Sequence, residues 1–189
     1  MSDIDNLLEE ARNHYQRADL YHYFSGDSDR VTTAQVALDT AEDTTLALSH
    51  YENEGIGLDE GEKYLRLYGF LQAIFLQQDA IKKLHELFVG SFTEPADTSA
   101  WKQLRELRNL TVGHPTEKGQ GNQPRRRAFI TRISLETDGF DYQVWHQETG
   151  KFSFERADLS AIYAVYKKEA VSFLGKVLAG VSGAPDYCP

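Results

Sequence analysis

One long helical segment dominates this sequence. From Asp59 to Val89, apolar residues recur at steps of three and four, the spacing that places side chains along one face of an α-helix. These residues are Leu67, Phe70, Ile74, Ile81, Leu84 and Phe88. A second apolar line widens the face and consists of Leu65, Tyr68, Phe75 and Leu76. One neighbouring helix cannot cover so wide a face, so we expect this helix to be central or to lie in a subunit interface.

Four further helices are predicted from capping residues and apolar periodicity. Their expected ranges are about 3–23, 32–54, 99–112 and 158–180. Thr32 or Thr33 is expected to cap the second helix of the chain, and Asp158 the last. Residues 115–126 hold two prolines, two glycines and no apolar residue, which predicts an exposed loop.

After Arg127 the period of the apolar pattern changes to two. Three short alternating runs are separated by Asp138-Gly139 and Thr149-Gly150, which are typical turn pairs. The sequence therefore predicts a mainly α fold, an up-and-down bundle of four to five helices with a small antiparallel β-meander, about 127–156, inserted before the last helix. We expect a single domain over residues 1–181 and a flexible tail at 182–189.

Composition limits the chemistry that the chain can carry. Its single cysteine, Cys188, can form neither an intramolecular disulfide nor a cysteine cage for a metal, and the histidines show no metal-ligand spacing. The N-terminal residues are acidic where a secretion signal would be basic, and no apolar run approaches the ~18 residues of a membrane span. We therefore expect a cytoplasmic protein without metal, cofactor or membrane contact.

Charge is unevenly distributed along the chain. The net charge of −9 alone argues against nucleic acid, because phosphate contacts need Lys and Arg. Residues 1–60 hold 14 acidic and three basic residues, whereas residues 101–132 hold eight basic and two acidic residues. The second window is either a solvated charge fluctuation or a local basic footprint for a nucleic acid.

The segment from Leu107 to Pro115 stands apart from the rest of the sequence. In it, Arg108 is followed by polar Asn109 and, after five intervening residues, by His114, near the expected end of a helix. The segment resembles the HEPN superfamily, whose active ribonucleases carry an Arg, usually followed by a polar residue, and a His after four to six intervening residues. The resemblance covers the helical parts of the chain and treats the meander as an addition. It implies a helical bundle in which this helix faces its copy in a homodimer.

These residue types suit RNA cleavage without a metal. The 2'-hydroxyl of RNA can attack the adjacent phosphorus if a base, an acid and a positive charge are at hand. Histidine changes charge near neutral pH, so His114 is a candidate acid and base, while Arg108 can clamp phosphate oxygens and Asn109 can orient the phosphate or the histidine. On an ideal helix Arg108 and His114 lie about 120° apart, so they converge only if the last turn distorts. Gly113 and Pro115 favour that distortion.

Simpler interpretations of the pair remain open. His114 follows Leu107 and Thr111 at helical steps, so it is alternatively a core histidine or a C-terminal cap. Arg108 is alternatively the partner of a carboxylate in the acidic N-terminal helices.

Two further polar groups are candidate binding residues. The first group interrupts the apolar helix and consists of Gln77, Gln78 and Asp79. These residues either face the dimer cleft beside Arg108 or form a packed hydrogen-bond network. The other would hold flanking phosphates and consists of Lys118, Arg125, Arg126 and Arg127. Trp145 or Tyr142 would add a stacking surface. The alternative for this second group is a solvated edge that guards the first strand.

Three functions follow, in order of preference. The first is a metal-independent endoribonuclease of HEPN type with a composite dimer site, a toxin or defence component held in check by an antitoxin or another inhibitory protein. The second is a non-catalytic HEPN-like module that binds nucleotide, RNA or a protein partner. The third is a purely structural helical dimer.

Overall fold

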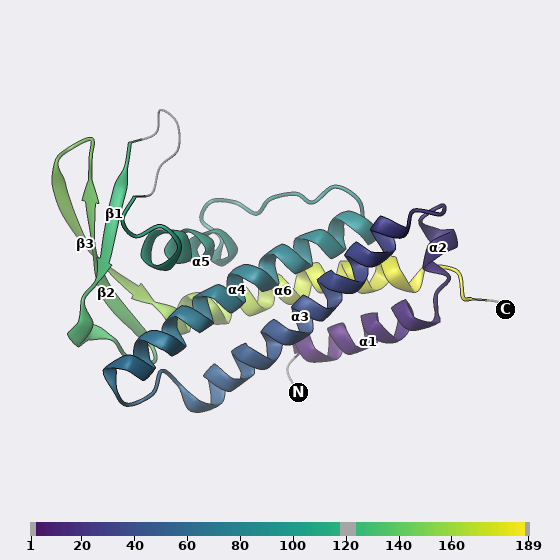
Figure 1. The fold of residues 1–189 in the computed structure, drawn as a ribbon, viewed down its shortest axis with the longest axis horizontal. Helices are drawn as coiled ribbons and strands as arrows, with labels where there is room; N and C mark the ends of the chain where they lie inside the picture. The colour runs from purple at the N-terminus through teal and green to yellow at the C-terminus, as the bar shows by residue number, and fades with distance from the viewer. Residues whose placement is uncertain (1–2, 118–123, 188–189) are drawn as a thin grey trace. The chain divides into compact units, whose positions relative to one another are not determined.

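The computed structural model describes residues 3–117 and 124–187 and is mainly helical (Figure 1). Its helices are α1 (Asp3–Arg17), α2 (Leu20–Tyr23), α3 (Ser28–Glu54), α4 (Glu60–Phe88), α5 (Ala100–Arg108) and α6 (Leu159–Ser182). Its strands are β1 (Arg126–Ile130), β2 (Gly139–His146) and β3 (Lys151–Asp158). The predicted fold class, helices with a small antiparallel meander before the last helix, is confirmed. No helix in the described ranges combines the length and the apolar character that crossing a membrane requires.

Local capping explains where most helices begin. Ser99 accepts a hydrogen bond from the Lys102 amide at the start of α5. Asp158, the predicted cap of the last helix, accepts one from the Ala161 amide at the start of α6. The expected cap of α3 at Thr32 or Thr33 is wrong. Asp27 accepts hydrogen bonds from two amides in the first turn, so α3 begins at Ser28 instead.

The expected first helix is broken into α1 and α2. Asp19 caps α2, and its own amide donates to the Pro185 carbonyl over 2.8 Å. The Tyr187 amide donates to the Arg17 carbonyl over 2.8 Å. The C-terminal segment, expected to be loose, is therefore hydrogen-bonded to the break as far as residue 187.

Residue contacts group the chain into two compact units. The first unit comprises the described residues of Met1–Ala47, Leu76–Glu94 and Lys167–Pro189, and the second those of Leu48–Phe75 and Pro95–Tyr166. In the first unit, Phe24 and Phe88 are buried with ring centroids 5.6 Å apart. In the second, Tyr51 and Phe70 stack at 4.1 Å, and Tyr163 meets Phe70 edge-on at 5.0 Å.

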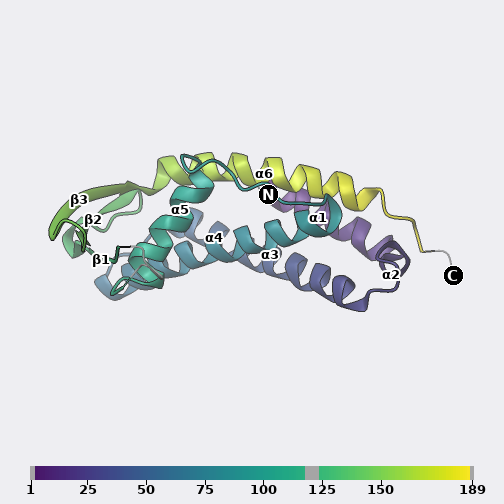
Figure 2. The same cartoon turned by 90° about the horizontal axis from the view of Figure 1, so that it is seen from above.

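The sheet belongs to the second unit. Its strand order is β1-β2-β3, both pairs are antiparallel, and β3 runs directly into α6 (Figure 2). One sheet face is buried, where Ala128 and Val144 pack on Leu110. The same face carries Tyr142 and the buried Phe140, because successive strand residues alternate between faces. The other face carries Phe129, Trp145, Phe152 and Phe154.

Candidate active site at the end of helix α5

Helix α5 ends in a π-helical turn, Asn109–Gly113. The His114 amide donates to the Asn109 carbonyl, five residues back, over 2.8 Å. A single widened turn of this kind in an α-helix is frequent at functional sites. His114 then leaves the helix with φ −139° and ψ 52°, outside the α-helical region that a following proline disfavours. The distortion that the Arg108 and His114 spacing requires is therefore present.

Arg108 is held by hydrogen bonds to two side-chain amides. Its Nε and Nη2 donate to Gln72 Oε1 over 3.0 and 2.7 Å, and its Nη1 donates to Asn109 Oδ1 over 3.0 Å. Its guanidinium also lies over the Phe75 ring at 4.2 Å, and Arg105 lies over the same ring at 4.1 Å. These contacts fix both the position and the plane of the Arg108 fork, as a phosphate-binding arginine needs.

The Arg108 guanidinium packs against the backbone of Gly113. A β-carbon placed on Gly113 would collide with Arg108 Nη1 and lie 3.0 Å from Arg108 Cζ. Glycine therefore permits the close approach. Because Gly113 is bonded to His114, the arginine head group lies beside the residue that precedes the histidine. The His114 side chain is exposed, which places it at the surface rather than in the core.

The polar group in α4 divides between interior and surface. Gln77 and Gln78 have no exposed surface, and Gln77 Nε2 donates to Thr45 Oγ1 over 3.0 Å. The Thr45 hydroxyl in turn donates to the Ala41 carbonyl over 2.8 Å. This is the packed network that the sequence left open as an alternative to a cleft. Asp79 is exposed and lines a shallow groove of about 330 Å³ in the first unit.

The arginines before and in β1 do not form one patch. Arg125 pairs with Glu117 at 2.9 Å, and Arg126 pairs with Glu106 on the buried side of the sheet. Arg127 points to the opposite face and lies over the Trp145 ring at 4.7 Å. Lys118, the fourth predicted member, lies outside the described residues.

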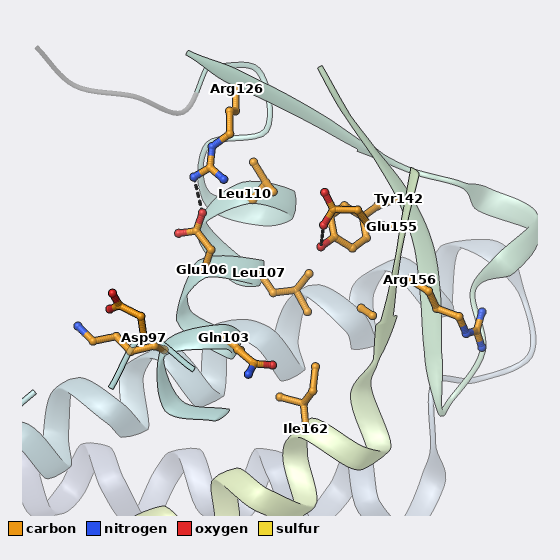
Figure 3. A pocket seen from close by; sticks show the side chains of 12 residues that line it. Asp97, Gln103, Glu106, Leu107, Leu110, Arg126, Tyr142, Glu155, Arg156 and Ile162 are labelled. Carbon is orange, nitrogen blue, oxygen red and sulfur yellow. Dashed lines mark hydrogen bonds and ion pairs between the residues drawn. The ribbon is translucent and has the colours of Figure 1, made fainter. Parts of the chain in front are cut away.

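A cavity of about 550 Å³ opens between α5 and the sheet (Figure 3). Arg126 pairs with Glu106 at its rim, and the Tyr142 hydroxyl donates to Glu155 Oε2 over 2.7 Å. Burial, and then this hydrogen bond, raise the pKa of Tyr142. Of the two predicted stacking residues, Tyr142 is thus engaged inside the cavity and Trp145 lies on the open face.

A second cavity, of about 640 Å³, adjoins the π-helical turn. Thr111 and Pro115 contribute to its wall on the side of the turn. Aromatic and basic side chains form half of the remainder, namely Tyr64, Tyr68, Phe129 and Arg132, and the wall also includes the acidic Glu60. Burial raises the pKa of Tyr64, so this phenol stays protonated and can donate a hydrogen bond at neutral pH.

Two residues that hold Arg108 were not found from the sequence. Gln72 stands 36 positions before Arg108, and Phe75 is one member of an apolar line in α4. The available signal was the polar Gln72 within that line, three positions before Phe75 and four after Tyr68. A polar residue at helical spacing in an otherwise apolar line indicates a partner on a facing element.

Comparison with known proteins adds no assignment. No family model, curated protein or solved structure matches the chain. Within residues 3–117 and 124–187, no group of three or more His, Cys, Asp or Glu side chains is placed to bind a metal ion. The functional argument therefore depends on the chemistry of the π-helical turn and its neighbours.

Proposed function

We propose that this chain is a metal-independent endoribonuclease of HEPN type, which cuts RNA at a site built by two copies of the π-helical turn. One observation carries the proposal. The turn holds the Arg108 guanidinium against Gly113, next to the exposed His114, so that a phosphate-binding fork and a titratable imidazole share one short segment.

The reaction assigns a role to each group. A base takes the proton of the 2'-hydroxyl, whose oxygen attacks the adjacent phosphorus, and the bond from phosphorus to the 5'-oxygen breaks. An acid gives a proton to the departing 5'-oxygen, which leaves a 2',3'-cyclic phosphate and a 5'-hydroxyl. Arg108 stabilises the negative charge on the phosphorane oxygens through its fork. His114 supplies proton transfer.

A second copy of the chain completes the site in this proposal. The reaction needs a base and an acid together, and one imidazole cannot fill both roles in the same step. His114 of a second copy supplies the missing group if a two-fold axis passes the turn.

An exposed apolar surface supports this arrangement. On α4, Leu65 is 74% exposed and Tyr68 is 42% exposed, on the apolar line that also carries Phe75. Gln72, which holds Arg108, lies between Tyr68 and Phe75 on the same line. A copy that covered this line would therefore approach the π-helical turn.

The test is cleavage of a single-stranded RNA by the purified protein with and without EDTA. We expect cleavage in EDTA, a 2',3'-cyclic phosphate on the product and no cleavage of DNA, which lacks the 2'-hydroxyl. His114→Ala should reduce kcat by about 100-fold or more and leave the melting temperature nearly unchanged, because the side chain is exposed. Arg108→Ala should impair both binding and turnover, and Arg108→Lys should restore only part of them, because an ammonium lacks the planar fork.

Mixing the two variants tests the dimer. A heterodimer of one Arg108→Ala chain and one His114→Ala chain should keep at most partial activity if both chains build each cleft. Activity above that of either variant alone would show that groups from two chains combine in one cleft, because a site within one chain would lack Arg108 or His114 in every molecule. Activity that EDTA abolishes, or cutting of DNA at the same rate, would refute the proposed mechanism.

A further inference from the structure

The outer face of the sheet carries an exposed aromatic surface. Two cross-strand rows form it, and each row takes one residue from each strand. The first row is Arg127, Trp145 and Phe152, and the second is Phe129, Gln143 and Phe154. We call these six residues the outer sheet face. Soluble proteins seldom leave so many large aromatic side chains in solvent on one small sheet without a binding role.

Exposure and ring contacts define this face as open. Phe129, Phe152 and Phe154 are 50%, 53% and 77% exposed. Phe129 and Phe152 meet edge-on with centroids 6.1 Å apart, so they form a continuous aromatic surface rather than isolated side chains. The opposite face packs against Leu110 and holds the sheet in place.

The charge of the outer sheet face is opposite to that of the whole chain. The chain has a net charge of −9, yet none of the six residues is acidic. Arg127 lies over Trp145 at 4.7 Å, and none of the carboxylates that the structure describes forms an ion pair with it. In the next row, Arg156 pairs with Asp141 at 3.1 Å.

We propose that the outer sheet face binds single-stranded RNA by stacking bases on its aromatic rings, with Arg127 on the backbone phosphates. Each base of a single strand offers a flat face to an aromatic ring, whereas the bases of a duplex are already stacked and paired. A cation that stacks on an exposed ring suits a ligand that alternates flat bases with anionic phosphates. This inference rests on the proposed ribonuclease and names the form of its substrate.

The surface leads toward the π-helical turn. Phe129 belongs both to the outer sheet face and to the wall of the 640 Å³ cavity. Thr111 and Pro115 line the same cavity, and Pro115 directly follows His114. A strand stacked on the sheet can therefore continue past Phe129 to the candidate active site. Tyr64 and Tyr68 offer further rings along this route.

Binding can be measured without cleavage in the His114→Ala protein. The probe is a fluorescein-labelled uridine oligonucleotide of about 10 nucleotides, followed by fluorescence anisotropy. We expect the double variant Phe152→Leu and Phe154→Leu to raise Kd by about tenfold or more, because Leu keeps apolar bulk and loses the ring. The matched variant Phe152→Tyr and Phe154→Tyr keeps both rings and should bind as the parent does. Leu58→Ala changes a residue that is 95% exposed and outside this face, and serves as the surface control.

Tryptophan fluorescence provides a second readout. The chain has two tryptophans, and Trp101 is buried, so bases stacked on the sheet should quench Trp145 alone. Trp145→Phe should abolish the quenching and retain the affinity. A duplex RNA of matched length should bind more weakly than the single strand.

Three outcomes would overturn the inference: no binding of the single strand by the parent, equal binding by the Leu and parent proteins, or loss of binding in the Tyr variant. Equal binding by the Leu variant would point to another nucleic-acid surface, and loss with Tyr would exclude stacking as the cause. The two proposals fail separately. If the parent binds RNA through these rings but the native chain does not cut it, binding at the outer sheet face is supported and the ribonuclease proposal is refuted. If the native chain cuts RNA but the Leu variant binds it as the parent does, the ribonuclease proposal is supported and binding at the outer sheet face is refuted.

Discussion

Two polar groups interrupt apolar helices in this chain, and the structure treats them in opposite ways. Gln77 and Gln78 have no exposed surface, and Gln77, in α4, donates a hydrogen bond to Thr45 in α3. Arg108 and His114 lie at a π-helical turn, with Arg108 partly exposed and His114 exposed. The first group is hydrogen-bonded inside the fold, whereas the second lies at the surface of the fold.

The difference shows how to separate a structural polar group from a candidate site. A buried amide must be hydrogen-bonded or it costs stability, so its partners lie within the core. The guanidinium group of Arg108 is instead oriented by hydrogen bonds to Gln72 and Asn109, and the π-helical turn begins at the next residue. Local distortion together with a fixed, solvent-accessible head group is the pattern expected of a functional residue. Substitutions in each group should therefore affect different quantities.

Gly113→Ala should produce the largest effect that this comparison predicts. The added methyl group would occupy the place of Arg108 Nη1, and the flexible arginine side chain would move away. We expect cleavage to fall by roughly 10- to 100-fold, because a small misplacement of a catalytic group is costly. The unfolding free energy should change by less than about 1 kcal/mol, since Ala is a good helix former.

Gly69→Ala is the matched control for that variant. It also introduces a methyl group into a helix of the second unit, but nothing lies within 4 Å of the added atom. It should leave cleavage unchanged and raise the unfolding free energy by about 0.5–1 kcal/mol. Wild-type cleavage by Gly113→Ala would show that the contact with Arg108 has no part in the reaction.

Gln77→Leu should show the opposite pattern. The substitution removes the donor to Thr45 Oγ1 from a fully buried position and should lower the unfolding free energy by about 1–3 kcal/mol. Cleavage per folded molecule should not change. Adding Thr45→Val should recover part of the loss, because replacing both partners by apolar groups of similar shape removes the unpaired atom. If Gln77→Leu instead reduced kcat with unchanged stability, the distinction between the two groups would fail.

Local signals explain what could be predicted from the sequence. The helix starts at Ser99 and Asp158 follow from caps that act within three residues, and the meander follows from turn pairs and alternation. The need for a distorted turn between Arg108 and His114 follows from helix geometry. These features depend on neighbours along the chain, so a single sequence contains them.

Long-range contacts explain the rest. The break at Asp19 is held by Pro185, and the fork of Arg108 by Gln72, each far away in the sequence. The alternation in β1 predicts two faces but does not say that Ala128, rather than Phe129, packs on Leu110. A binding surface on the outer face of the meander could therefore be recognised only after the sheet was placed.

A third polar group, His85, gives the smallest and most easily isolated effect. Its side chain is buried in the first unit, near Phe92 at 5.4 Å and Phe173 at 6.0 Å. Its Nδ1 forms no hydrogen bond with any residue that the structure describes. Burial lowers the pKa of His85 from its usual 6.5, and the charge of Lys176 adds to this.

The pH dependence follows from that direction. Above pH 6.5 the imidazole is neutral in both the folded and the unfolded chain, so it contributes no pH dependence. As the pH falls below 6.5, the unfolded chain binds a proton that the folded chain does not, and the unfolding free energy decreases by at most about 1.4 kcal/mol per pH unit. His85→Phe should remove this contribution, so its stability relative to wild type should rise between pH 7.5 and pH 5.5 in urea titrations. A constant difference between His85→Phe and wild type across this range would mean that His85 protonates equally in both states, and that its burial has no electrostatic cost.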